Sequence, residues 1–180
     1  MKSASCSSMA TLWLLGLFLV GCAGTPEIRY FTLDTADEIA ADPSTKLYIS
    51  RVQVPDYLDD NRLWVRPEPH RLEALPYVRW AEHLPRAITR GLQLRLGAGI
   101  SEPTDGHRVL VDVYRFEANW GDGERPDRMI LTAGWRIENG AGREQLRLEK
   151  PVPDRDAATL VAIKAELVTE LSKRIAGSAN

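Results

Sequence analysis

Apolar residues recur at helical spacing in two segments of the chain. The first covers residues 80–96, and Pro85 fits only the first turn of a helix, so we expect a helix that begins near Pro85 and ends at Gly97 and Gly99. The second runs from about Asp156 to Ala176. Each stripe predicts a helix face that packs against one sheet, in preference to a face that binds a partner. The stripes are Trp80, Leu84, Ile88, Leu92 and Leu96, and Leu160, Ile163, Leu167, Leu171 and Ile175.

Alternating apolar and polar residues predict strands elsewhere in the chain. The alternation is clearest in residues 129–138, and the turn sequence that follows predicts a hairpin with residues 143–149. In residues 108–120 the apolar positions change sides midway, which predicts a bulge or a strand buried on both faces. Strands around two amphipathic helices indicate an α/β or α+β sandwich. The six predicted strands are residues 29–33, 46–54, 62–66, 108–120, 129–138 and 143–149.

The N-terminus has the pattern of an export signal. Residues 9–20 (MATLWLLGLFLV) form an apolar run that is too short to cross a bilayer as a helix, and Lys2 supplies the usual positive start. The run ends in Leu19-Val20-Gly21-Cys22, which resembles the lipobox of bacterial lipoproteins, where signal peptidase II cuts before the acylated cysteine. The alternative is an incidental cysteine behind an ordinary signal or a short membrane anchor.

The lipobox divides the chain into three expected parts. Residues 1–21 form a signal peptide, residues 22–27 a lipidated tether and residues 28–177 a single domain. Acyl chains on Cys22, palmitate among them, give stable membrane anchoring. Ala23 stands where an inner-membrane retention signal has aspartate, so we expect the outer membrane and its periplasmic face. Between Cys22 and Ile28 the extended tether spans at most about 20 Å, which keeps the domain close to the bilayer.

Composition excludes several classes of protein. The 180 residues include 23 basic and 25 acidic side chains, so the chain lacks the basic surplus that nucleic-acid binding requires. Two cysteines exclude a disulfide framework and a four-cysteine zinc site, and no histidine has a second ligand at metal-binding spacing. Glu117 with Asp122 or Glu124 is the one conceivable acid–base pair, and a flexible acidic turn explains these residues more simply. We expect no enzyme, no cofactor and no metal.

Aromatic and apolar side chains gather in two loop-like stretches, residues 54–60 and 75–80, and at a position between them. In one interpretation they cover the sheet or the start of the first helix, and Trp80 in particular is core. In the other they form an exposed patch for a partner protein or a lipid chain. Both interpretations fit the pattern. The candidate residues are Pro55, Asp56, Tyr57, Leu58, Trp64, Tyr77 and Trp80.

Four motifs follow the lipobox in order: Arg29–Leu33 (RYFTL), Val54–Asp59 (VPDYLD), Arg79–Leu84 (RWAEHL) and Val111–Glu117 (VDVYRFE). In this order they resemble the PqiC family, the ABC-type transport auxiliary lipoproteins. The resemblance spans essentially the whole chain after the signal. His83 departs from the family pattern, in which proline or another residue is expected before Leu84. The start of the helix that follows this motif is retained.

The resemblance implies a three-layer α/β sandwich, in which a mixed sheet packs with two main amphipathic helices. It also implies a non-enzymatic docking subunit of an MCE/ABC-type intermembrane lipid transport system that supports envelope integrity. The implied partners are an MCE-domain periplasmic protein and an integral membrane transporter subunit, and a homo-oligomeric ring is left open. Two alternatives remain: a periplasmic lipid-binding carrier with an apolar cavity, and a structural envelope-assembly lipoprotein without a transport role.

Overall fold

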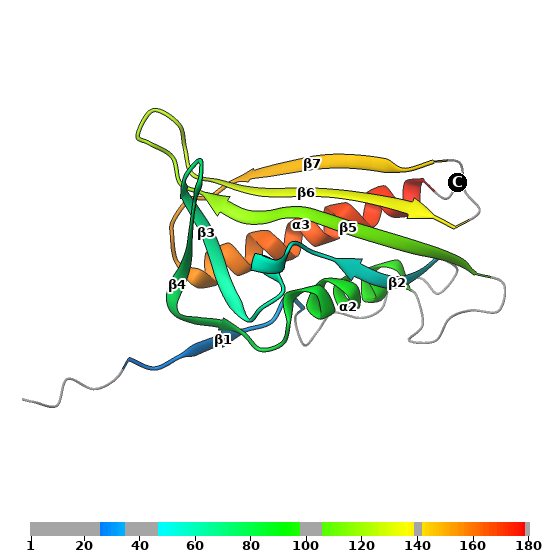
Figure 1. Ribbon diagram of the computed structural model, residues 1–180, viewed down its shortest axis with the longest axis horizontal. Helices are drawn as coiled ribbons and strands as arrows, with labels where there is room; N and C mark the ends of the chain where they lie inside the picture. Colours follow the sequence, from blue (N-terminus) through cyan, green and yellow to red (C-terminus); the bar gives the residue numbers. More distant parts are fainter. Residues whose placement is uncertain (1–25, 35–46, 98–105, 139–141, 179–180) are drawn as a thin grey trace, which may run out of the picture.

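The computed structural model describes residues 26–34, 47–97, 106–138 and 142–178. The signal peptide expected at residues 1–21, the lipidation site Cys22 and the helix end expected at Gly99 lie outside these residues. Figure 1 shows a long sheet with two helices along it. The elements are β1 (Arg29–Phe31), β2 (Leu47–Gln53), the 3-10 turn η1 (Asp56–Leu58), β3 (Arg62–Glu68), β4 (Arg71–Trp80), α2 (Leu84–Leu96), β5 (His107–Asn119), β6 (Arg128–Ile137), β7 (Glu144–Pro151) and α3 (Ala157–Gly177).

The seven strands form one mixed sheet in the order β1-β4-β3-β5-β6-β7, with β2 on the same edge of β5 as β3. Strand β1 runs parallel to β4, and both β2 and β3 run parallel to β5, whereas the other pairs are antiparallel. Pairing with β2 extends to Asp112, and pairing with β3 starts at Ala118. Residues 113–117 of β5 therefore have no strand partner on that edge within the described chain.

Both helices lie on one face of the sheet. Helix α2 packs against β2 and against α3, and α3 packs against β6 and β7. The core between helices and sheet is continuous, and Trp80 and Phe116 are among its largest buried side chains. The predicted α/β sandwich with a mixed sheet and two amphipathic helices is confirmed. Because α2 and α3 share one face, neither of these two helices covers the opposite face.

The six predicted strands are present, with ends shifted by one or two residues. The predicted hairpin forms between β6 and β7, although residues 139–141 of its turn are outside the described chain. A bulge interrupts the pairing of β5 with β6 between Val113 and Arg115, as the change of apolar side predicted. The expectation that residues 75–80 form a loop is wrong, because these residues form the second half of strand β4.

Local sequence explains where the helices begin and end. Helix α2 has Pro85 in its first turn and closes on Gly97, whose φ of 66° is the left-handed conformation that glycine adopts freely. Helix α3 begins after Asp156, whose carboxylate accepts a hydrogen bond from the backbone N–H of Ala158. Within the described residues, neither helix is long and apolar enough to cross a membrane.

Candidate docking surface

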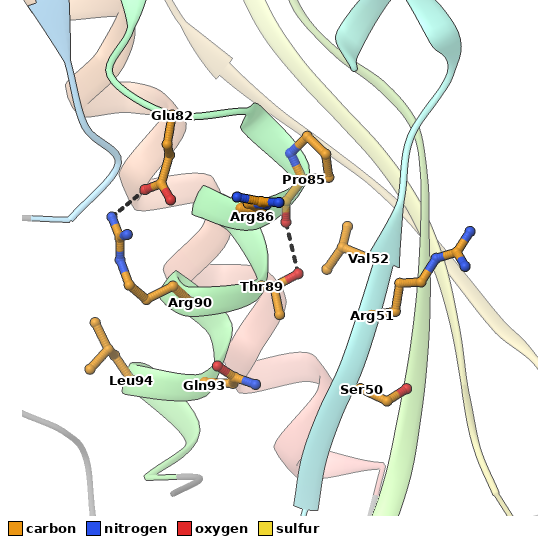
Figure 2. A pocket seen from close by; sticks show the side chains of 10 residues that line it. All are labelled: Ser50, Arg51, Val52, Glu82, Pro85, Arg86, Thr89, Arg90, Gln93 and Leu94. Atoms are coloured by element: carbon orange, nitrogen blue, oxygen red, sulfur yellow. Dashed lines mark hydrogen bonds and ion pairs between the residues drawn. The ribbon is translucent and has the colours of Figure 1, made fainter. Parts of the chain in front are cut away.

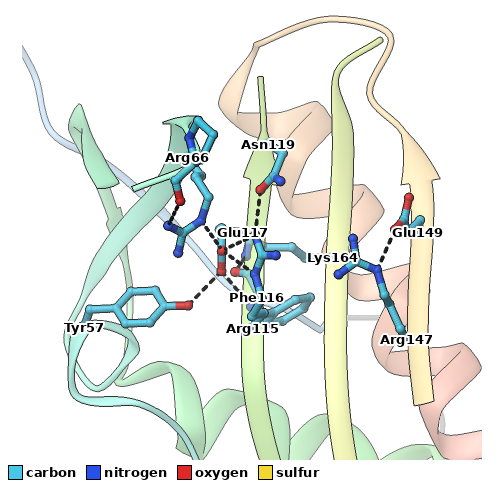
Figure 3. Close-up of polar contacts among 10 residues, drawn as sticks. Tyr57, Arg66, Arg115, Phe116, Glu117, Asn119, Arg147, Glu149 and Lys164 are labelled. Atoms are coloured by element: carbon cyan, nitrogen blue, oxygen red, sulfur yellow. Dashed lines mark hydrogen bonds and ion pairs between the residues drawn. The ribbon is translucent and has the colours of Figure 1, made fainter. Parts of the chain in front are cut away.

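The polar centre of the sheet is Glu117 of β5, whose side chain is completely buried. Its carboxylate accepts hydrogen bonds from the Tyr57 hydroxyl at 2.8 Å, from Nε of Arg66 at 2.9 Å and from Nε and Nη2 of Arg115 at 3.0 and 2.9 Å. Figure 3 shows these side chains converging from η1, β3 and β5. Two guanidinium groups around one carboxylate make the cluster rigid and give it a net positive charge.

This cluster occupies the break between β2 and β3. Phe116 pairs with Leu131 of β6 on one edge, but its other edge has no strand partner within the described chain, and two side chains bond to its backbone there. The Glu117 carboxylate accepts from the Phe116 N–H at 3.0 Å, and Nζ of Lys164 in α3 donates to the Phe116 carbonyl. Buried backbone groups are costly when unpaired, so Glu117 and Lys164 stabilise a gap that a strand would otherwise fill.

Burial perturbs the ionisation of the residues in this cluster. Desolvation lowers the pKa of Lys164 to about 7, and the nearby Glu117 carboxylate only partly opposes it. For Glu117 itself desolvation acts to raise the pKa, but the hydrogen bonds from Arg66 and Tyr57 and the charge of Arg115 hold it below its ordinary value. Desolvation and the Glu117 charge raise the pKa of Tyr57. At neutral pH the cluster therefore holds Glu117 as a carboxylate and Tyr57 as a neutral phenol.

Next to this cluster, a groove of about 720 Å³ opens on the face of the sheet opposite the helices. Five arginines line it, against three carboxylates, and Trp120 lies among them beneath the guanidinium of Arg155 at 4.6 Å. The guanidinium of Arg128 has no hydrogen-bond or ion-pair partner among the described residues. Such a surface is complementary to acidic groups. The charged lining residues are Arg66, Arg115, Arg125, Arg128, Arg147, Glu68, Asp122 and Glu149.

The structure divides the candidate residues of the sequence analysis among three places. Tyr57 and Trp64 lie together beside the Glu117 cluster, with ring centroids 6.5 Å apart, and the Trp64 indole N–H donates to Asp60 at 3.1 Å. Pro55 and Asp56, which begin η1, flank them. Leu58 and Trp80 are buried in the core, so they are not part of an exposed patch. Tyr77 is exposed on β4.

A second hollow of about 620 Å³ lies between β2 and α2. Figure 2 shows Val52 of β2 facing Pro85 and Thr89 of α2 across it. The side-chain amide of Gln93 in α2 donates to the Ile49 carbonyl of β2 at 3.0 Å. This hydrogen bond links α2 to β2 at one end of the groove. Val52, Pro85 and Leu94 give the groove apolar surface, whereas the other seven of its ten lining residues are polar or charged.

The sequence analysis did not identify two charged residues that the structure places at the centre of this surface. The interpretation of Glu117 as part of a flexible acidic turn is wrong: it is a buried residue inside β5, within the strand predicted over residues 108–120. Phe116 and Ala118 on either side of it face the helices, so the alternation alone predicts an exposed polar position for Glu117 and gives no signal of its burial. Lys164 interrupts the buried face of α3 between Leu160 and Val168, and a lysine at such a position requires a buried partner.

The described residues contain no cluster of three or more histidine, cysteine or acidic side chains that could hold a metal ion. All three histidines, His70, His83 and His107, are exposed. Asp122, the other member of the conceivable acid–base pair, bonds to Arg125 of its own turn.

Comparison with known proteins assigns this chain to a family. Residues 31–176 match the family of ABC-type transport auxiliary lipoprotein components, and the chain belongs to this family. The resemblance to the PqiC family predicted from the sequence motifs is confirmed.

Two solved structures have a similar fold. The crystal structure of an uncharacterized protein is 17% identical, with a TM-score of 0.68, and the match covers 86% of this chain and all of that one. A protein from Xanthomonas campestris is 15% identical, with a TM-score of 0.64, over 83% of this chain and 93% of its own. At these identities the likeness shows the fold alone. A search of curated proteins finds no match.

Proposed function

We propose that this chain is a lipid-anchored, non-enzymatic docking subunit of an MCE/ABC-type system that transports lipid between membranes. The membership in the transport auxiliary family over residues 31–176 carries the proposal. Residues 1–21 are then the removed signal, Cys22 is the lipidated residue and the domain faces the periplasm from the outer membrane. The partners are an MCE-domain periplasmic protein and an integral membrane subunit.

The docking surface in this proposal is the arginine-lined groove together with Tyr57 and Trp64. Aromatic and arginine side chains supply much of the binding energy at protein interfaces. Arg66 and Arg115 are fixed by Glu117, so they lose little conformational freedom when a partner binds. Arg128, without a partner in the described chain, is available for a carboxylate of the incoming segment. The surface therefore suits an acidic segment of the transporter.

Charge reversal in the groove tests this surface. The double variant Arg128→Glu and Arg147→Glu places like charges against an acidic partner, and we expect co-purification of the MCE-domain protein to fall at least about tenfold. The matched control is Arg174→Glu, because Arg174 is exposed on α3 and does not line the groove. Unchanged recovery with the double variant, at normal abundance of a folded protein, contradicts the assignment of the groove.

A second candidate function is supported by the groove between β2 and α2. Its volume of about 620 Å³ is enough for part of an acyl chain, and Val52, Pro85 and Leu94 supply apolar surface for it. Native mass spectrometry of gently purified protein tests this candidate, with Thr89→Trp as the variant that fills the groove. Bound lipid that Thr89→Trp removes supports a carrier role. A protein without bound lipid contradicts it and leaves the docking role unaffected.

A further inference from the structure

Three large apolar or aromatic side chains are exposed in the described part of the chain, and all three lie at the β1–β4 edge of the sheet. Ile28 is 44% exposed, Tyr30 63% and Tyr77 48%. Strand β1 pairs with β4 in parallel, with Arg29 beside Val78 and Tyr30 beside Arg79. Continuing this register by one residue places Ile28 beside Tyr77. The three side chains therefore form one patch, which we call the edge patch.

The backbone of β4 is distorted where it presents Tyr77. Between the pairs Trp64–Ala74 and Arg62–Arg79 the register with β3 shifts, so β4 bulges there. Within this bulge Tyr77 has a φ of 56°, a conformation that a residue with a side chain rarely adopts. The residues after it, Val78 and Trp80, return to the core. The fold thus maintains backbone strain at Tyr77, whose ring is turned outward, and such strain is frequent at functional sites.

Chain geometry indicates what covers the edge patch. Ile28 is six residues after Cys22, so an anchor at Cys22 holds the patch within about 20 Å of the bilayer. Tyrosine favours the membrane–water interface, where its ring is buried and its hydroxyl stays hydrated. A second copy of the chain is a poorer occupant, because β1 has only three residues and offers little backbone for strand pairing.

We propose that the edge patch rests on the lipid surface and, together with the acylated Cys22, fixes the orientation of the domain on the membrane. This inference depends on the lipid anchor of the proposed function. A single flexible tether would leave the domain free to rotate, whereas a second contact beside it keeps one edge down. The arginine-lined groove then faces in a fixed direction relative to the bilayer.

Spin labels test the contact. Cys6 lies in the removed signal and Cys22 is acylated, so Tyr30→Cys or Tyr77→Cys introduces the only free thiol of the mature lipidated protein. The control is Lys173→Cys near the far end of α3, where the side chain is 70% exposed. The lipidated proteins are placed on vesicles of phosphatidylethanolamine and phosphatidylglycerol. Flotation first measures anchoring, and collision with oxygen and with a water-soluble nickel chelate then measures the depth of each label.

Flotation tests the lipid anchor, and the accessibility of the labels tests the edge patch. We expect the protein to float, and labels at positions 30 and 77 to be shielded from nickel at least about threefold more than the label at position 173. A floating protein whose three labels are equally open to nickel overturns the edge patch and keeps the anchor. Shielding that persists without vesicles, with coupling between labels of two chains, overturns it in favour of a second copy. A protein that does not float overturns the anchor and the inference with it.

Discussion

Lys164 provides the sharpest test of the physical account, because it is a lysine that is only 1% exposed in the middle of α3. Its Nζ lies 3.9 Å from the centre of the Phe116 ring and donates to the Phe116 carbonyl. Desolvation lowers its pKa from the ordinary 10.5 to about 7. In the folded protein Lys164 therefore releases its proton near neutrality, whereas in the unfolded chain it keeps the proton until about pH 10.

This difference makes the stability depend on pH with a definite sign. Between pH 7 and pH 10 the unfolded chain binds more protons at this site than the folded chain does, so the free energy of unfolding rises with pH. Each pH unit across this interval contributes up to about 1.4 kcal/mol, and from pH 7 to pH 9 the gain is about 2 kcal/mol. Above pH 10 the raised pKa of Tyr57 acts in the opposite direction, so pH 9 is the upper limit of the test.

The assay is urea unfolding at pH 7, 8 and 9 for wild type, Lys164→Met and Lys173→Met. Wild type and the exposed-lysine control Lys173→Met are expected to gain about 2 kcal/mol over this range, because both keep Lys164. Lys164→Met is expected to show no such gain. Equal pH dependence in Lys164→Met and wild type refutes the argument, since the titrating group would then lie elsewhere.

Three further predictions concern single residues of the fold and the site. Trp80→Ala should lower the free energy of unfolding by about 3–5 kcal/mol in urea titration, because it empties a core position, and an unchanged melting temperature would place Trp80 at an interface instead. Tyr77→Gly should raise stability by about 1 kcal/mol by relieving the positive φ, whereas Tyr77→Ala should not, and equal stabilities of the two variants would contradict the strain. Glu117→Gln should cost about 3 kcal/mol at pH 7, because it leaves two guanidinium groups without their carboxylate. Since the pKa of Glu117 is lowered in the folded state, its stabilising contribution is present above about pH 4, and the difference from Glu117→Gln should narrow below that pH; a constant difference down to pH 2 would argue against the lowered pKa.

The sequence predicts most of the fold because its elements have strong local patterns. The stripe of α3 and the alternation of β6 each bury one face, so the period alone identifies them. Strand β4 was missed because Pro76 and the bulge at Tyr77 break its alternation, and its pairing with β1 and β3 comes from distant parts of the chain. The placement of both helices on one face likewise depends on tertiary packing that periodicity does not contain.

The candidate surface was less predictable than the fold. Tyr57 and Trp64 were identified by their aromatic character, and they do lie together. The charged centre beside them was missed, because Glu117 and Lys164 are 47 residues apart and meet only when α3 packs across the break between β2 and β3. A buried charge has no local signature beyond its apolar neighbours. Leu58 and Trp80 belong to two of the four motifs that resemble the PqiC family. Both are buried, so these motifs include core positions as well as surface positions.

The central claim, that this protein docks a transporter from a lipid anchor, is tested most directly by affinity purification of the native lipidated protein from membranes. Co-eluting proteins are identified by mass spectrometry, and Cys22→Ala is the control. The account predicts that an MCE-domain protein is enriched with wild type and depleted with Cys22→Ala. Equal enrichment with both would keep the docking role and contradict the importance of the anchor. Recovery of envelope-assembly proteins alone, or of no partner, would contradict the transport role.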